Sequence, residues 1–177
     1  VATSAQRVGA VNTITVEAGA LTGHNTDAEG FRQTLGPLAG ESSGRAVVLG
    51  AGGAARAVVS VLLDQGWFVA TLNRTPDRVA ALAEAVPPEK RSRLTVGALK
   101  PGPATRAVRG ADLLVNATSV GSDGASDPWP DSVGLPAVTI DLVAWPPVTP
   151  LVSRARKAGG VAVGGLPMLV VQAALAF

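Results

Sequence analysis

A glycine-rich turn has the spacing of a phosphate-binding motif. Residues 46–49 form a short apolar run, and residues 50–55 follow it as Gly-Ala-Gly-Gly-Ala-Ala, the pattern GxGxxA. The first glycine permits a tight turn, the second lets the backbone approach a pyrophosphate, and the last small residue lets a helix pack close to a strand. Free N–H groups at the start of that helix would point at the anion. We therefore expect a pyrophosphate to lie against Gly50, Ala51, Gly52, Gly53 and Ala54.

The residues after this turn complete a strand–helix–strand unit. Apolar residues recur with helical spacing at Val58, Val59, Leu62 and Leu63. A second apolar strand is expected at 68–72. The glycine turn then lies between the first strand and the helix, as a dinucleotide-binding unit requires. The alternative is a glycine turn in an α/β domain that binds no ligand.

The end of the second strand indicates which dinucleotide fits. Units that bind NAD usually carry Asp or Glu about 20 residues after the glycines, where the carboxylate holds the ribose 2′-hydroxyl. This chain instead has Asn73, Arg74 and Thr75 there, and Arg78 follows one helical turn later. Two guanidinium groups and a hydroxyl suit a 2′-phosphate, because arginine makes paired, charge-assisted hydrogen bonds to phosphate. The stretch predicts NADP; the alternative is that both arginines only solvate the start of a helix.

Strand and helix patterns alternate along most of the chain. Strands are predicted at 46–49, 68–72, 94–96, 112–117, 137–143 and 161–163, and helices at 76–85, 104–109 and 148–158. Before them we expect a hairpin from 11–16 and 21–24, a helix at 26–36 that ends at Gly36-Pro37, and a linker at 40–44. This alternation indicates an α/β fold with a doubly wound, Rossmann-like parallel sheet. Ligands bind beyond the carboxyl ends of such strands.

The composition excludes several classes of protein. The 177 residues are 47% hydrophobic and 16% charged, with a net charge of +2 and no run of Lys or Arg, so no nucleic-acid partner is expected. With no cysteine and one histidine, neither a disulfide nor a metal site is expected. No membrane span or signal peptide is visible, so we expect a cytoplasmic protein with a small-molecule substrate. The opening at Val1 and the uncapped helical pattern that runs to Phe177 suggest a chain cut at both ends.

Several short segments form a pattern along the chain. In chain order they are Gly9-Ala10-Val11-Asn12-Thr13, Asn25-Thr26-Asp27, the glycine turn with Asn73-Arg74-Thr75, Asn116-Ala117-Thr118-Ser119, Asp141-Leu142-Val143 followed by Pro146 and Thr149-Pro150, and Gly165-Leu166-Pro167-Met168-Leu169 with Gln172. Their order and spacing resemble those of the shikimate dehydrogenases. Glutamyl-tRNA reductases also pair such a glycine turn with Asn-Arg-Thr, but the first two segments together with the last are specific. The chain is similar to the shikimate dehydrogenases over nearly its whole length.

The resemblance implies an activity and a set of site residues. In that family NADPH delivers hydride to the C3 ketone of 3-dehydroshikimate and gives shikimate, a step of chorismate and aromatic amino-acid biosynthesis. Asp27 would be half of a catalytic Lys/Asp pair that stabilises the developing alkoxide and relays its proton. The implied substrate-binding residues are Asn12, Asp27 and Gln172. The implied 2′-phosphate site is Asn73, Arg74, Thr75 and Arg78, and the nicotinamide side is Thr118, Leu142 and Gly165.

The same resemblance divides the chain into three parts. Residues 1–26 would be a remnant of an N-terminal substrate domain, residues 27–164 an NADP-binding domain, and residues 165–177 a helix that returns to the substrate domain. A monomer or a homodimer is expected.

The chain departs from the family pattern in two places. The family's catalytic Lys and its Ser-x-Ser turn precede the GAVNT motif and lie outside this sequence, and Lys90, Lys100 and Lys157 lie in or beside predicted surface helices. Ala144 stands where the family usually has a Tyr that helps close the substrate pocket. Two alternatives therefore stay open: a quinate/shikimate dehydrogenase paralogue, and a catalytically silent NADP-binding module. A glutamyl-tRNA reductase would need a nucleophilic cysteine, which the chain does not have.

Overall fold

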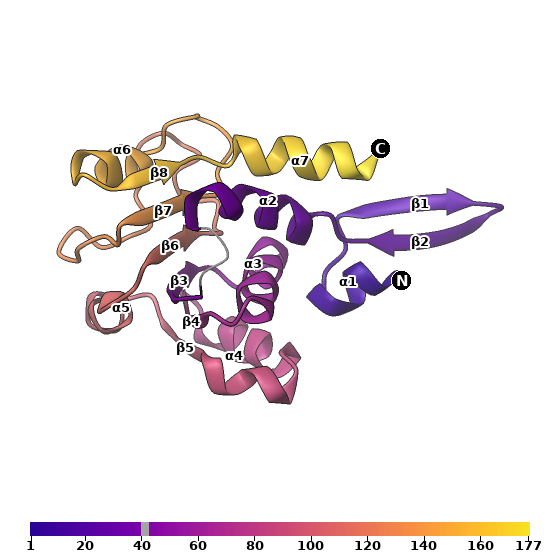
Figure 1. The fold of residues 1–177 in the computed structure, drawn as a ribbon, viewed down its shortest axis with the longest axis horizontal. Helices are drawn as coiled ribbons and strands as arrows, with labels where there is room; N and C mark the ends of the chain where they lie inside the picture. The colour runs from indigo at the N-terminus through magenta and orange to yellow at the C-terminus, as the bar shows by residue number, and fades with distance from the viewer. Residues whose placement is uncertain (40–42) are drawn as a thin grey trace.

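A six-stranded parallel sheet forms the centre of the computed structural model, which describes residues 1–39 and 43–177 (Figure 1). Its strands are β3 (Arg45–Leu49), β4 (Phe68–Asn73), β5 (Leu94–Ala98), β6 (Leu113–Asn116), β7 (Val138–Asp141) and β8 (Val161–Val163). They lie in the order β5-β4-β3-β6-β7-β8, and each neighbouring pair is parallel. This is the strand order of the doubly wound dinucleotide-binding fold. The α/β, Rossmann-like fold predicted from the sequence is therefore confirmed.

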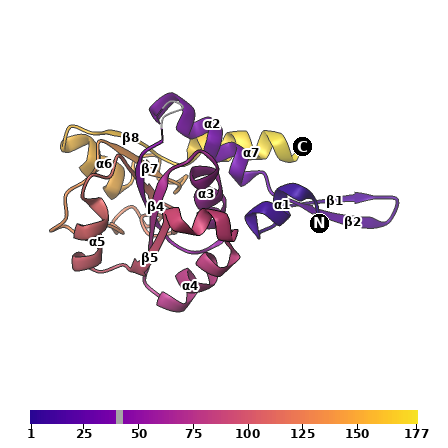
Figure 2. The same cartoon turned by 60° about the horizontal axis from the view of Figure 1, so that its bottom comes forward.

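Helices cover both faces of this sheet (Figure 2). Their bounds are α1 (Thr3–Val8), α2 (Asp27–Ala39), α3 (Gly53–Asp64), α4 (Pro76–Ala85), η1 (Pro88–Arg93), α5 (Pro101–Val108), α6 (Pro150–Lys157) and α7 (Leu166–Ala176). Alternate residues of β3 point to opposite faces of the sheet. Ala46 and Val48 belong to the buried cluster with α2, α3, α4 and α7, whereas Val47 and Leu49 belong to the cluster with α5 and α6. Among the described residues, no helix combines the length and the apolar character needed to cross a bilayer.

A β-hairpin extends from one side of this body (Figure 1). Its strands are β1 (Thr13–Glu17) and β2 (Ala20–His24), which pair antiparallel. The two residues between them, Ala18 and Gly19, have φ angles of +48° and +81°. Positive φ at both central residues is what a type I′ turn requires, and that turn matches the twist of the flanking strands. The predicted hairpin is confirmed, although its first strand begins at Thr13 rather than at residue 11.

Helices α2 and α7 lie side by side with their backbones close together (Figures 1 and 2). The close approach occurs at Gly30 of α2. A Cβ atom added there would lie 3.1 Å from the carbonyl oxygen of Met168 and 3.2 Å from Cβ of Gln172. The missing side chain of Gly30 thus lets α7 cross α2 closely, and this crossing brings Gln172 beside the first turn of α2.

The structure corrects the expectation that Gly36-Pro37 ends the helix predicted at 26–36. Helix α2 continues through Pro37 to Ala39. Proline removes only one hydrogen bond so near the end of a helix, and Leu38 and Ala39 gain contacts by packing against the buried cluster that contains Phe31 and Leu35. Residues 40–42 of the predicted linker lie outside the described part of the chain.

Other differences concern short elements and helix starts. Helices α1 and η1 were not predicted, because six-residue segments without an apolar period give little signal. Helix α5 begins at Pro101 rather than at 104, and α6 begins at Pro150 rather than at 148. In both cases proline occupies the first helical position, where its missing N–H has no partner to lose.

Replacing Gly30 tests the contact between α2 and α7. Alanine normally favours a helix over glycine by about 1 kcal/mol, but at Gly30 its Cβ would meet the backbone of α7. We therefore expect Gly30→Ala to destabilise the protein in urea unfolding. Gly36→Ala in the same helix is the matched control, because a Cβ there meets nothing within 4 Å, and it should stabilise the protein by about 0.5 to 1 kcal/mol. Equal stabilisation by both variants would contradict this account of the packing.

Candidate active site

The glycine turn after β3 leaves room for a ligand. Gly50 has a φ of +112°, and a Cβ there would lie 2.9 Å from the carbonyl oxygen of Ala117, so glycine is required. At Gly52 an added Cβ would meet nothing within 4 Å, which leaves the outer side of the turn open. Helix α3 begins at Gly53 without a side-chain cap or an acidic residue in its first turn. An open turn and an uncapped helix start fit a pyrophosphate.

The end of β4 presents positive charge to solvent. Arg74, Thr75 and Arg78 are exposed, and within the part of the chain that the structure describes neither arginine forms an ion pair with a carboxylate. The side-chain amide of Asn73 donates to the carbonyl oxygen of Thr75 at 3.0 Å, so Asn73 shapes this loop. Two arginines without carboxylate partners are the groups that a 2′-phosphate would need.

A second cluster joins three side chains that are far apart in the sequence. The Asn12 amide nitrogen donates to Asp27 Oδ1 at 2.8 Å and to Gln172 Oε1 at 3.0 Å. It also lies 3.0 Å from Thr26 Oγ1, while Asn12 Oδ1 accepts the backbone N–H of Thr26 at 3.0 Å. One NH₂ group has two hydrogens for these three oxygens, so one acceptor stays incompletely satisfied. The cluster can therefore bind a ligand that carries hydroxyl groups.

The first turn of α2 leaves Asp27 available for this cluster. The Asn25 side chain accepts the backbone N–H of Ala28 at 3.2 Å, so Asn25 supplies a capping hydrogen bond at the start of α2. Burial raises the pKa of the Asp27 carboxyl above its ordinary value, and the hydrogen bond from Asn12 opposes this rise. A carboxyl group with a raised pKa is better suited to exchange a proton near neutral pH.

The segment that carries Asn12 packs beside the glycine turn. Asn25 donates from its amide nitrogen to the carbonyl oxygen of Ala10 at 3.2 Å, which ties this segment to the start of α2. A Cβ on Gly53 would lie 3.5 Å from Cβ of Ala10. The hydrogen-bonding cluster and the phosphate-binding turn are thus held next to each other by the residues between α1 and β1.

The three residues expected on the nicotinamide side follow the carboxyl ends of adjacent strands. Thr118 follows β6, and its hydroxyl donates to Asn116 Oδ1 at 2.7 Å. Leu142 follows β7. Gly165 follows β8 and packs so closely that an added Cβ would lie 2.2 Å from the carbonyl oxygen of Leu142. Leu142 and Gly165 are therefore in direct contact, and Thr118 lies on the neighbouring loop.

A buried polar network lies at the carboxyl ends of β6 and β7, and no role was assigned to it from the sequence. Asn116 donates to Asp141 Oδ1 at 2.8 Å, and Thr149 donates to Asp141 Oδ2 at 2.6 Å; all three residues are fully buried. Burial raises the pKa of Asp141, and the hydrogen bonds to its carboxylate partly oppose this rise. The network fixes the loops after β6 and β7 and the start of α6. Its sequence signal was the polar residue that ends each of two apolar strands.

The strand order, the open glycine turn and the two exposed arginines define a dinucleotide-binding domain of the dehydrogenase type. Residues 36–123 match the sequence model of the family described as Shikimate / quinate 5-dehydrogenase. The NADP(+) shikimate dehydrogenase from one strain of Thermus thermophilus is 43% identical over the whole chain, which covers 64% of that enzyme. The chain is thus similar over its whole length to members of the shikimate dehydrogenase family.

Solved structures show the same similarity. The shikimate 5-dehydrogenase from another strain of Thermus thermophilus, in complex with NADP(H) and shikimate, has a TM-score of 0.80 at 41% identity over 99% of this chain and 64% of its own. The ligand-free 5-ketofructose reductase of a Gluconobacter strain has a TM-score of 0.79 at 32% identity, again over 99% of this chain and 64% of its own. The chain thus spans less than two thirds of the length of these relatives.

Removing the Asp141 carboxylate tests the buried network. In Asp141→Ala, the Asn116 amide, the Thr149 hydroxyl and the backbone N–H of Val143 would lose an acceptor in a site without solvent. Each unsatisfied buried group costs about 1 to 3 kcal/mol. We expect a total loss of about 3 kcal/mol or more in urea unfolding. A loss below about 1 kcal/mol would show that the network does not hold this edge together.

Proposed function

We propose that the protein is an NADP-dependent shikimate dehydrogenase that reversibly reduces 3-dehydroshikimate to shikimate. The observation that supports this most is the cluster in which Asn12 contacts both Asp27 and Gln172 beside an open phosphate-binding turn. A substrate ring with several hydroxyls would satisfy the carboxylate and amide groups of the cluster, and such a polar site discriminates against analogues that lack them. The names of the family's relatives point to the same reaction.

The residues of the chain would have the following roles in binding and catalysis. The glycine turn and the start of α3 would bind the pyrophosphate of the cofactor, and Arg74, Thr75 and Arg78 its 2′-phosphate, on the loop that Asn73 shapes. Thr118, Leu142 and Gly165 would line the nicotinamide, which supplies a hydride when bound. Asn12 and Gln172 would hold substrate hydroxyls in place. Asp27 would pair with a lysine that lies outside residues 1–177. The pair would stabilise the developing alkoxide and provide its proton.

The predicted division of the chain suits this reaction. Residues 1–26 and 165–177 would contribute Asn12 and Gln172 from the substrate side, and residues 27–164 would bind NADP. The contact between α2 and α7 supports this arrangement, because it brings Gln172 from the end of the chain to Asp27 at the proposed boundary.

Another substrate is the main alternative. Ala144 is half-buried on the loop after β7, and its methyl group is smaller than the Tyr usual in the family. A wider pocket there would admit a substrate such as quinate, and the similarity to a 5-ketofructose reductase shows that the fold is compatible with a reductase named for another ketone. Steady-state kinetics with quinate and shikimate as separate substrates would distinguish these specificities. A silent NADP-binding module would turn over neither.

Replacing Asp27 with asparagine separates its chemical role from its role in the fold. In the full-length protein, Asp27→Asn should lower turnover at least about a hundredfold, because an amide cannot exchange the proton. The asparagine oxygen can still accept the hydrogen bond from Asn12, so the variant should fold. Near-normal turnover of 3-dehydroshikimate would remove Asp27 from the mechanism.

The same variant has an expected pH dependence of stability. Because burial raises the pKa of Asp27 above 3.8, its ionised form destabilises the folded state at neutral pH. Asp27→Asn removes this cost, so its Tm should equal or exceed that of the unchanged protein at about pH 7. The difference should decrease as the pH falls and vanish well below pH 3.8, where the carboxyl is protonated in both the folded and the unfolded state. A lower Tm for the variant at neutral pH would contradict the raised pKa.

Cofactor choice tests the proposed 2′-phosphate site. Arg74→Ala should raise the Kd of NADP about tenfold or more and change the Kd of NAD less than about twofold, because the lost charge-assisted hydrogen bonds involve only the extra phosphate. Calorimetry measures both values. Arg109→Ala is the matched control. Arg109 is exposed at the end of α5, close to the amino end of β6, whereas Arg74 follows the carboxyl end of β4. Equal losses for NADP and NAD would show that no 2′-phosphate binds at Arg74.

A further inference from the structure

A hollow separate from the candidate active site lies between α1, α3 and α4. The hollow is partly open to solvent. Its floor is aliphatic and comes from Val8, Val59, Leu63, Leu82 and Val86, all of which are buried. None of the residues assigned to the substrate or the cofactor lines it.

Positive charge exceeds negative charge at the rim of this hollow. Among the described residues, Asp64 is the only carboxylate that lines it, and it accepts hydrogen bonds from Arg7 at 3.0 Å and from Lys90. Two cations therefore share one carboxylate. Arg56 is a third cation at the rim, and within residues 1–39 and 43–177 it forms no ion pair. The rim thus has positive charge that no described carboxylate of the hollow balances.

Arg56 is placed to meet a ligand in the hollow. It lies near the start of α3 and is half-buried. One terminal nitrogen, Nη1, is 3.4 Å from the position that a Cβ on Gly9 would occupy, so the guanidinium lies beside the end of α1. A half-buried guanidinium is less hydrated than a fully exposed one, which strengthens a charge-assisted hydrogen bond to an anion.

We propose that this hollow binds a small organic anion, in which a carboxylate or similar acidic group is attached to an apolar body about the size of one aromatic ring. The aliphatic floor would bury the apolar body, and Arg56 would bind the acidic group. Small-molecule sites commonly combine an apolar lining with a few placed polar groups. An inorganic anion would leave the floor without a partner, and a neutral ring would leave Arg56 without one.

Matched probes test both parts of the proposal in the protein produced at its full natural length. Methyl NMR should show that benzoate shifts the resonances of Val59, Leu63, Leu82 and Val86 in a saturable way. Benzyl alcohol has the same ring without charge, and acetate has the charge without a ring, so both should bind much more weakly. Absence of saturable shifts with benzoate, or equal binding of benzyl alcohol, would overturn the proposal.

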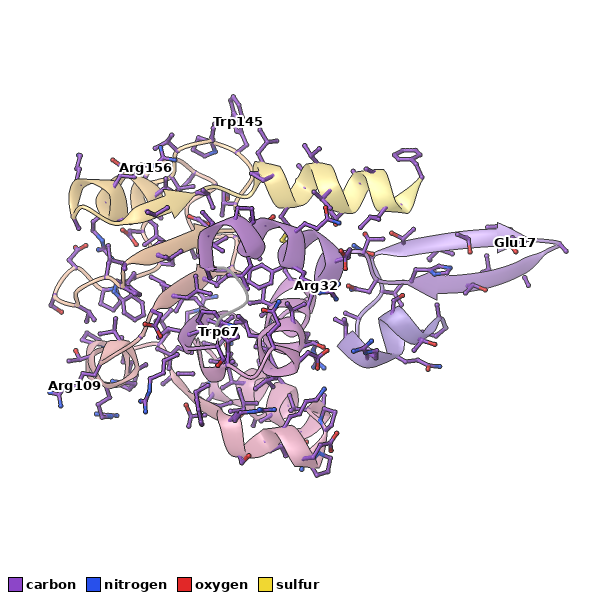
Figure 3. All side chains as sticks on the ribbon, viewed as in Figure 1. Glu17, Arg32, Trp67, Arg109, Trp145 and Arg156 are labelled. Carbon is purple, nitrogen blue, oxygen red and sulfur yellow. The ribbon has the colours of Figure 1, made fainter. Side chains whose placement is uncertain are left out.

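Two substitutions locate the binding. Arg56→Gln should weaken benzoate about fivefold or more, because a charge-assisted hydrogen bond is lost. Arg109→Gln removes the same charge beside α5, on the other side of the molecule from α1 (Figure 3), and should leave the affinity unchanged. Ser60→Phe should block binding by filling the hollow without changing its charge, which keeps the test valid if Arg56→Gln unfolds. Equal losses in Arg56→Gln and Arg109→Gln, or full binding by Ser60→Phe, would place the benzoate elsewhere.

Discussion

The side-chain amide of Asn12 is the interaction on which the candidate active site depends. It connects the segment before β1, the start of α2 and the middle of α7, which are separated by up to 160 positions in the sequence. Its nitrogen contacts the side chains of Asp27 and Gln172, and its oxygen accepts the backbone N–H of Thr26. A single planar group thus fixes the relative positions of a carboxylate and a second amide. This arrangement can discriminate between hydroxyl groups on a ring.

The parallel sheet provides the other half of the site. Its doubly wound order separates β4 and β5 from β6, β7 and β8 on either side of β3, which places the glycine turn at the point where the order reverses. The buried carboxylate of Asp141 then holds the loops after β6 and β7, through Asn116 and Thr149. The proposed cofactor side therefore depends on the fixed carboxyl ends of the strands, and the proposed substrate side depends on helix packing at Gly30.

Local patterns in the sequence predicted most of the fold. The apolar strands, the glycine turn and Asn73-Arg74-Thr75 are local signals. The structure has the strands in one sheet, the glycine turn directly after β3, and Asn73-Arg74-Thr75 at the end of β4, as predicted. The extension of α2 beyond Pro37 was missed because it depends on the packing of Leu38, which is a tertiary contact. The convergence of Asn12, Asp27 and Gln172 came only from the family resemblance, since alone they would be ordinary polar residues of a turn, a helix start and a helix. The contact between Asp141 and Thr149 was not predicted, because it depends on the course of the loop that joins β7 to α6.

A crystal structure of the full-length protein with NADP+ and shikimate would test the central claim most directly. We predict that shikimate hydroxyls lie within hydrogen-bond distance of Asn12, Asp27 and Gln172, with the 2′-phosphate of the cofactor at Arg74. Shikimate bound away from these three side chains, or an Asp27 carboxylate that points away from the bound ligand, would contradict the account.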